Sequence, residues 1–235
     1  RQLLDLDRAR QQHDAYFAEL RAAGVAVTVL PEAPELPDAT FVEDAAVVLD
    51  ELAIFCRPGV ASRAPEVELL APAIAAVRRV FEIRAPGTLE GGDVLRLGRT
   101  LYVGHSGRTN AEGIRQFGDI VAPFGYTVQP VGVHGCLHLK TAVTSPASGL
   151  LIANPEWIEL SAFRDHEILP VLPTEPWGAN ALPLNGRVFV AASAPQTAER
   201  LTARGLDVRR LDLTELQKAE AGLTCLSVLF SQPVG

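Results

Sequence analysis

The chain has 235 residues, of which 48% are hydrophobic and 21% are charged, with 19 Gly and 17 Pro. This composition excludes a disordered chain, a collagen-like repeat and a small disulfide-stapled domain, and the length suffices to bury a full hydrophobic core. The formal net charge is -7 at pH 7. Neither nucleic acid nor an anionic membrane is therefore expected as a partner, because both are bound by clustered positive charge, and a cationic small molecule is favoured instead.

The three cysteines, Cys56, Cys136 and Cys225, are an odd number without CxxC spacing. They indicate neither a disulfide framework nor a structural zinc site, and they fit a reducing compartment. No apolar run approaches the roughly 18 residues that span a bilayer, and no export signal opens the chain. We therefore expect a cytoplasmic protein. The sequence has no methionine, even at position 1, so we expect the native start to lie upstream.

The first predicted element in chain order is a helix over 9–23, which ends before Gly24. The apolar run at 25–30 then predicts a strand. A proline-containing loop follows, and after it come a second apolar strand at 52–56 and a helix over 66–80.

This order of elements recurs about every 45 residues, a period that indicates a repeat architecture. Predicted strands lie at 81–85, 100–104, 126–131, 149–153, 167–173 and 187–192, predicted helices lie at 109–121 and 196–204, and the final repeat runs over 207–230. The final repeat lacks closing elements, and the N-terminal helix belongs to no repeat. We therefore expect the N-terminal helix to close the final repeat.

Repeated modules around a pseudo-rotation axis bring their equivalent positions to one central place. The position before the second strand of each repeat is occupied, in order, by Glu43 with Asp44, Glu90 with Asp93, His138, Asn180 and Cys225. Carboxylates, an imidazole and a thiol are therefore expected to converge.

The thiol and the imidazole suit nucleophilic catalysis. A thiol that attacks carbon must become a thiolate, and the leaving nitrogen needs a proton donor, which a histidine supplies near neutral pH. Cys225 and His138 are the candidates for these two roles. The alternative for each is a buried structural residue, because both stand among apolar or small neighbours.

The acidic residues of this set suit a cation. Burying several carboxylates is costly unless a cation balances them, and a planar guanidinium with its five N–H donors matches such a site. An arginine-like ligand would also carry a carboxylate. Arg63 and Arg108 are candidates to bind it, because they occupy equivalent loops after a second strand. The alternative for each is an exposed loop arginine.

Five segments together resemble the dimethylarginine dimethylaminohydrolases (dimethylargininases) of the guanidino-group-modifying pentein superfamily. They are LPDATFVEDAAVV, APGTLEGGDV, GHSGRTNAEG, CLHLKT and GLTCLSVLF, and the resemblance runs from about Asp14 to Phe230. It implies an α/β fold, the fivefold pseudo-symmetric propeller of ββαβ modules, in a single catalytic domain over 1–235 with neither metal nor organic cofactor. Family members also have an N-terminal strand and a flexible segment that closes over the substrate. Because this chain begins near the helix that follows them, we expect the N-terminal strand to be absent.

The resemblance implies roles for nine residues. Three would be catalytic: Cys225 as the nucleophile, His138 as the general acid and base, and Glu90 as the carboxylate that orients His138. Six would bind the substrate: Glu43 and Asp44 at the guanidinium, Phe41 in the pocket wall, Arg63 and Arg108 at the α-carboxylate, and Asp38 at the α-amino group.

The expected function is hydrolysis of N-ω-methylated arginine to citrulline and an alkylamine through a covalent thiouronium intermediate on Cys225. An arginine deiminase, an amidinotransferase and a non-catalytic binder of arginine derivatives are the alternatives. Deiminases usually carry a helical insertion for which 235 residues leave no room, and a pure binder needs no thiol. The residues leave open a homodimer, zinc bridging Cys225 and His138 as an inhibitor, the preferred alkylated arginine, and the roles of Trp177, Asn180 and Cys136.

Overall fold

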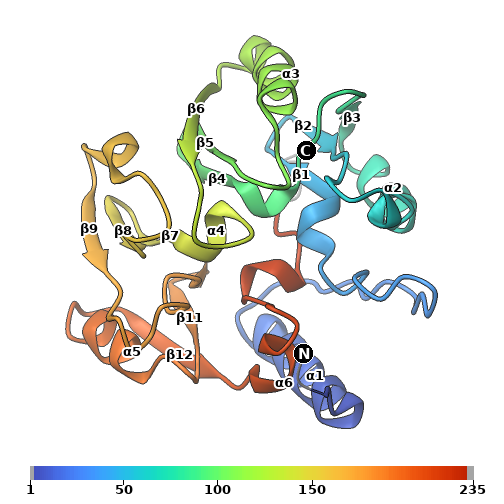
Figure 1. Ribbon diagram of the computed structural model, residues 1–235. Helices are drawn as coiled ribbons and strands as arrows, with labels where there is room; N and C mark the ends of the chain where they lie inside the picture. Colours follow the sequence, from blue (N-terminus) through green and yellow to red (C-terminus); the bar gives the residue numbers. More distant parts are fainter. Residues whose placement is uncertain (1–2, 232–235) are drawn as a thin grey trace. The chain divides into compact units, whose positions relative to one another are not determined.

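Each sheet among the described residues has three strands in sequence order, of which the first two are antiparallel and the last two parallel (Figure 1). The computed structural model describes residues 3–231, which form two units. The first unit contains 3–29, Thr141–Pro155 and Phe163–Thr224, and the second contains Leu30–Lys140, Glu156–Ala162 and 225–231. The expectation of a single catalytic domain stays a prediction.

The second unit contains two sheets, and in each of them a helix connects the second strand to the third. One sheet has β1 (Ala46–Val48), β2 (Leu52–Phe55) and β3 (Arg79–Glu82), with α2 (Glu66–Ala75) between β2 and β3. The other has β4 (Val94–Leu97), β5 (Thr100–His105) and β6 (Thr127–Gly132), with α3 (Ala111–Val121) between β5 and β6. This is the expected ββαβ order. The strand predicted at 81–85 nevertheless completes the preceding sheet, because β3 pairs with β2.

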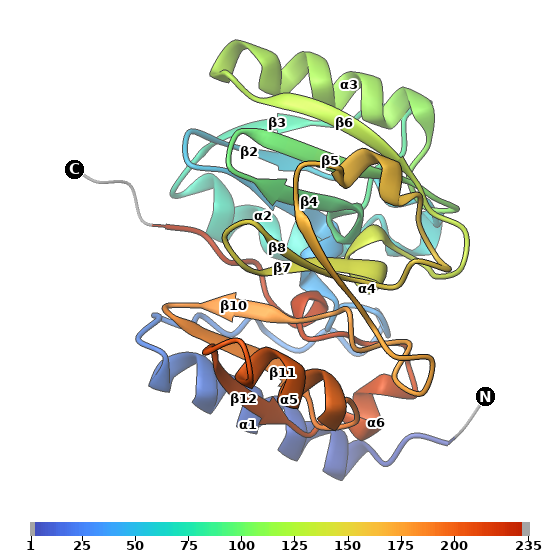
Figure 2. The ribbon, with the colours of Figure 1, turned by 90° about the vertical axis from the view of Figure 1, so that its left-hand side faces the viewer.

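Local sequence explains why α3 forms and which face it buries. The side chain of Asn110 caps the helix by accepting a hydrogen bond from the N–H of Gly113 at 2.8 Å. Ile114, Phe117 and Val121 follow at helical spacing, and all three are buried in the core of this unit. Figure 2 shows α3 lying along β6, so this apolar stripe covers the sheet.

The first unit contains the other two sheets. One has β7 (Val143–Ala147), β8 (Leu150–Ala153) and β9 (Glu167–Pro170), and the other has β10 (Leu182–Leu184), β11 (Arg187–Ala191) and β12 (Asp207–Leu211). The helix α5 (Pro195–Thr202) connects β11 to β12, whereas the connection from β8 to β9 contains the 3-10 turn η5 (Leu160–Phe163). The short helix α4 (Leu139–Ala142) precedes β7.

The N-terminal helix closes the last repeat, as expected. The helix α1 (Leu6–Ala22) packs against β12 and α6 (Thr214–Gln217), as Figure 2 shows. The hydroxyl of Tyr16, which is fully buried, donates to the carbonyl of Leu223 at 3.0 Å. The N–H of Glu215 donates to the side chain of Gln12 at 2.9 Å.

Two expectations about secondary structure are wrong. Residues 25–30 form no strand and pair with no strand of the described chain. The helix predicted over 66–80 ends at Ala75, because 79–82 pair with β2 instead. Both errors have one cause: a strand exists only where another segment takes its hydrogen bonds, and local sequence does not specify that partner.

No helix among residues 3–231 combines the length and the apolar composition needed to cross a bilayer.

Candidate functional site

The second unit brings together three of the predicted site residues. Asp44 lies in a 3-10 turn before β1, Glu90 precedes the turn that leads into β4, and His138 precedes α4. One ligand atom of each lies within 4.8 Å of the other two, and all three side chains are buried. The predicted convergence of these three repeat positions is confirmed.

The closest pair in this cluster is His138 and Glu90. Nε2 of His138 lies 2.6 Å from Oε2 of Glu90 and 3.7 Å from Oδ1 of Asp44. Burial lowers the pKa of His138, but the carboxylates of Asp44, Glu90 and Asp93 outweigh burial and raise this pKa to about 9. The imidazole is therefore protonated at neutral pH, the state in which it can donate a proton to a leaving group.

Backbone N–H groups hold the two carboxylates beside His138. The N–H of Gly59 donates to Oε1 of Glu90 at 2.9 Å, and the N–H of Gly92 donates to Oδ1 of Asp44 at 3.0 Å. A β-carbon on Gly92 would lie 2.8 Å from Cγ of His138, so a residue without a side chain is required at this position.

Arg63 places a guanidinium inside this carboxylate cluster. It is 4% exposed, so the alternative of an exposed loop arginine is wrong. Its Nη1 donates to Oδ2 of Asp44 at 2.8 Å and lies 3.5 Å from Oε2 of Glu90, and its Nε and Nη2 donate to the carboxylate of Glu66. Burial raises the pKa of Asp44, but His138 and Arg63 lower it overall. All three guanidinium nitrogens are thus paired, and the contact of Arg63 with a substrate carboxylate stays a prediction.

Arg108 is a further cation of this site. Its side chain is half-buried, and its Nη1 lies 3.6 Å from Oε1 of Glu90, which is too long for a hydrogen bond. Nη1 itself is buried and has no hydrogen-bond partner among residues 3–231. Because a buried donor without a hydrogen bond is costly, this geometry favours an anionic group of a ligand beside Arg108.

The other predicted binding residues belong to the same unit and differ in burial. Glu43 is buried and accepts from Nζ of Lys140 at 2.5 Å, a pairing that the sequence analysis missed although Lys140 belongs to the CLHLKT segment. Phe41 is half-buried, and Asp38 is exposed in the preceding turn. The substrate contacts of these residues stay predictions.

Asp93 is buried and links two segments of the site, a role that the sequence analysis missed. Its Oδ1 accepts from the N–H of Leu139, the residue after His138, at 2.9 Å, and its Oδ2 accepts from the hydroxyl of Ser106 at 2.7 Å. Oγ of Ser106 in turn accepts from the N–H of Arg108 at 3.0 Å. Burial raises the pKa of Asp93. One carboxylate thus connects the His138 segment to the Arg108 loop.

The three cysteines lie in different surroundings, and none forms a disulfide. Cys225 is half-buried in the 3-10 turn η6 (Thr224–Leu226) and opens the last segment of the unit that contains His138. Burial raises the pKa of Cys136 to about 12 and also raises the pKa of Cys56. Neither of these two thiols supplies a thiolate at neutral pH, so Cys225 is the candidate nucleophile.

The ligand atoms of Asp44, Glu90 and His138 also lie close enough together to hold a metal ion. The guanidinium of Arg63, however, lies 2.8 Å from Asp44 and 3.5 Å from Glu90. A metal ion in this cluster would therefore be repelled by a cation that is already paired there. The expectation of no metal stays a prediction.

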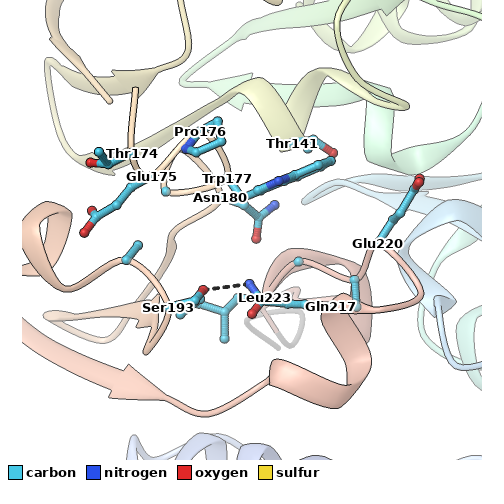
Figure 3. Close-up of a pocket in the computed structure, with 15 residues that line it drawn as sticks. Thr141, Thr174, Glu175, Pro176, Trp177, Asn180, Ser193, Gln217, Glu220 and Leu223 are labelled. Atoms are coloured by element: carbon cyan, nitrogen blue, oxygen red, sulfur yellow. Dashed lines mark hydrogen bonds between the residues drawn. The ribbon is translucent and has the colours of Figure 1, made fainter. Parts of the chain in front are cut away.

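A pocket of about 200 Å³ lies in the first unit (Figure 3). Trp177 and Asn180, two of the three residues left without an assigned role, lie together on one side of it, and a hydrogen bond from Gln217 to Ser193 lies opposite. Trp177 is 45% exposed, whereas Asn180 is 5% exposed.

Comparison with known proteins gives matches over most of the chain. Residues 3–159 match the family described as N,N dimethylarginine dimethylhydrolase, eukaryotic. The chain is 41% identical to the N(G),N(G)-dimethylarginine dimethylaminohydrolase of Streptomyces coelicolor, over 97% of this chain and 88% of that protein. It is 35% identical to the Pseudomonas aeruginosa protein of the same name, over 96% of this chain and 90% of that protein.

A solved structure of the same family also matches this chain. A cysteine-to-serine mutant of dimethylarginine dimethylaminohydrolase from Pseudomonas aeruginosa, complexed with citrulline, matches with a TM-score of 0.94 at 34% identity. The match covers 97% of this chain and 90% of that chain. It confirms the expected α/β pentein fold.

Proposed function

We propose that this chain, which belongs to the dimethylarginine dimethylaminohydrolase family, hydrolyses N-ω-methylated arginine to citrulline and an alkylamine. The observation that carries the proposal is the buried contact of 2.6 Å between Nε2 of His138 and Oε2 of Glu90, beside a second carboxylate. This contact supplies a protonated imidazole in a site whose carboxylates suit a guanidinium. The citrulline bound to the related Pseudomonas aeruginosa structure supports citrulline as the product.

The proposed reaction has two stages on Cys225. In the first, the thiolate adds to the guanidinium carbon, and His138 protonates the alkylamine nitrogen as its bond to carbon breaks, which leaves a thiouronium. In the second, the neutral His138 takes a proton from water while the water oxygen adds to the same carbon. The carbon–sulfur bond then breaks, the thiolate is restored, and the hydroxyl proton passes through solvent to the departed amine.

The remaining residues of the proposal bind the substrate. Glu43 and Asp44 hold the guanidinium in its charged form, which makes its carbon electrophilic. Arg108 binds the α-carboxylate, which would supply the hydrogen-bond acceptor that its buried Nη1 lacks among the described residues. Arg63 assists Arg108, Asp38 contacts the α-amino group and Phe41 lines the pocket.

Product analysis separates this proposal from its alternatives. The purified chain is incubated with asymmetric dimethylarginine, monomethylarginine and arginine in parallel, and citrulline and the released amine are quantified. We expect citrulline with an equal amount of dimethylamine or methylamine. Faster ammonia release from arginine would indicate a deiminase, a new guanidino compound in the presence of an acceptor amine would indicate an amidinotransferase, and binding without product would indicate a binder.

The proposal also includes location and assembly. Three cysteines without a disulfide support a cytoplasmic protein, because thiols persist in a reducing compartment. A homodimer is the assembly that we propose to test, by sedimentation of the purified chain.

A further inference from the structure

The fourth repeat carries a neutral amide where the first three carry carboxylates and an imidazole. Asn180 lies shortly before β10, as Asp44, Glu90 and His138 lie shortly before β1, β4 and β7. Asn180 is 5% exposed and belongs to the first unit. The roles proposed above do not use it.

The nitrogen and the oxygen of the Asn180 side-chain amide both form hydrogen bonds with Thr224. Its Nδ2 donates to Oγ1 of Thr224 at 3.1 Å, and its Oδ1 accepts from the N–H of Thr224 at 3.2 Å. Thr224 is the first residue of η6, and the next residue is Cys225. The pair of hydrogen bonds therefore fixes both the backbone and the side chain of the residue that precedes the candidate nucleophile.

The surroundings fix Asn180 in turn. The hydroxyl of Thr144, which is 2% exposed, donates to the carbonyl of Ala179 at 2.6 Å and accepts from the N–H of Ala181 at 3.1 Å. The backbone is thus held on both sides of Asn180. A β-carbon on Gly222 would lie 2.5 Å from Oδ1 of Asn180, so the chain that leads to Cys225 passes close against the amide.

We propose that Asn180 is a positioning residue of this enzyme. It holds Thr224 by two hydrogen bonds and thereby sets the direction in which the side chain of Cys225 points. An amide suits this task because it donates and accepts at once, whereas an ionised carboxylate only accepts. A nucleophile must be held within a few tenths of an ångström of its productive position, and a displacement of about 1 Å can cost about 100-fold in rate. The inference rests on the proposed function for the role of Cys225.

Variants of Asn180 and Thr224 provide the test. Thr224→Val removes the hydroxyl acceptor and keeps the shape, Thr224→Ser keeps the hydroxyl, and Asn180→Ala removes both hydrogen bonds. Asn154→Ala is the matched control: Asn154 is 4% exposed in the same unit, and its amide donates to the carbonyl of Pro176 at 3.1 Å. Each full-length variant is assayed for kcat and KM with asymmetric dimethylarginine, for the rate of Cys225 carbamidomethylation by iodoacetamide with peptide mass spectrometry, and for its urea midpoint.

We expect Asn180→Ala and Thr224→Val to lower kcat about 10- to 100-fold with little change in KM, and to change the alkylation rate of Cys225. Thr224→Ser should retain kcat, and Asn154→Ala should lose stability while keeping kcat. Wild-type kcat and alkylation rate in Asn180→Ala, or an equal loss of kcat in Asn154→Ala, would overturn the inference. If the wild-type chain turns over no methylated arginine, the proposed function fails, and the alkylation rates alone still decide whether Asn180 positions Cys225.

Discussion

Arg63 donates a hydrogen bond to Oδ2 of Asp44 at 2.8 Å, and both side chains are buried. The protein's own guanidinium therefore pairs with one oxygen of a carboxylate that is also expected to bind the guanidinium of a substrate. Glu66 completes the ion-pair network at 2.7 Å from Nη2 of Arg63. The buried carboxylates of the site are thus balanced by a cation of the same chain, which explains how they can be buried at all.

Removal of Arg63 should destabilise the fold. Arg63→Gln leaves Asp44 and Glu66 buried without their cation, and breaking a buried ion pair in this way costs about 3–5 kcal/mol. The free energy of unfolding is measured by urea titration. The control is Arg115→Gln, because Arg115 pairs with Glu112 and Asp119 on the exposed surface of α3 and should contribute little. Equal unfolding midpoints for the two variants would contradict the prediction.

Activity should fall as the pH rises through about 9. His138 has its pKa raised from 6.5 to about 9 in the folded chain, so it can act as a general acid up to that pH. The same shift means that protonated His138 stabilises the fold fully below pH 6.5, and that this contribution is lost as the pH rises through about 9. Glu90→Gln removes a carboxylate that raises this pKa, so the alkaline limb of the kcat profile should move to lower pH. An unmoved limb would show that Glu90 does not set the pKa of His138.

A methyl group at Gly92 should disrupt the site, whereas a methyl group at Gly118 in the same unit should not. In Gly92→Ala, the new carbon would lie 2.7 Å from Oδ1 of Asp44 and 2.8 Å from Cγ of His138, so both side chains must move. We expect kcat to fall at least about 100-fold, since a 1 Å displacement has that effect. Gly118→Ala is the control, because its nearest neighbour would be 3.8 Å away and alanine favours the helix. Comparable activity of the two variants would show that the site tolerates the displacement.

Asp93 and Ser106 should affect different kinetic constants. Ser106→Ala removes the hydroxyl that holds the N–H of Arg108, so KM should rise with little change in kcat. Asp93→Ala also releases the N–H of Leu139, next to His138, so kcat should fall as well. Asp93→Asn can still accept from Leu139 and should restore much of kcat. A rise in KM alone for Asp93→Ala would show that this carboxylate does not position His138.

Substitution of the two catalytic candidates should separate chemistry from binding. Cys225→Ser should abolish citrulline formation, and His138→Gly should lower kcat by about 10²- to 10⁴-fold, the usual contribution of an acid–base residue. Both variants should still bind asymmetric dimethylarginine, measured by isothermal titration calorimetry. A thiouronium adduct trapped on Cys225 and located by mass spectrometry would identify the nucleophile, and citrulline formation by Cys225→Ser would exclude it.

The sequence alone determined the repeat, most of its strands and helices, and the meeting of Asp44, Glu90 and His138. These features follow from local periodicity and from the equivalence of positions in repeated modules, both of which are visible along the chain.

Only the tertiary structure decided the partners of these residues. Arg63 turns inward to carboxylates, Asp93 bridges two segments, and Asn180 binds Thr224, whereas residues 25–30 pair with no strand of the described chain. A hydrogen bond between residues far apart in sequence depends on how the helices and strands pack, and the local sequence pattern does not predict that packing.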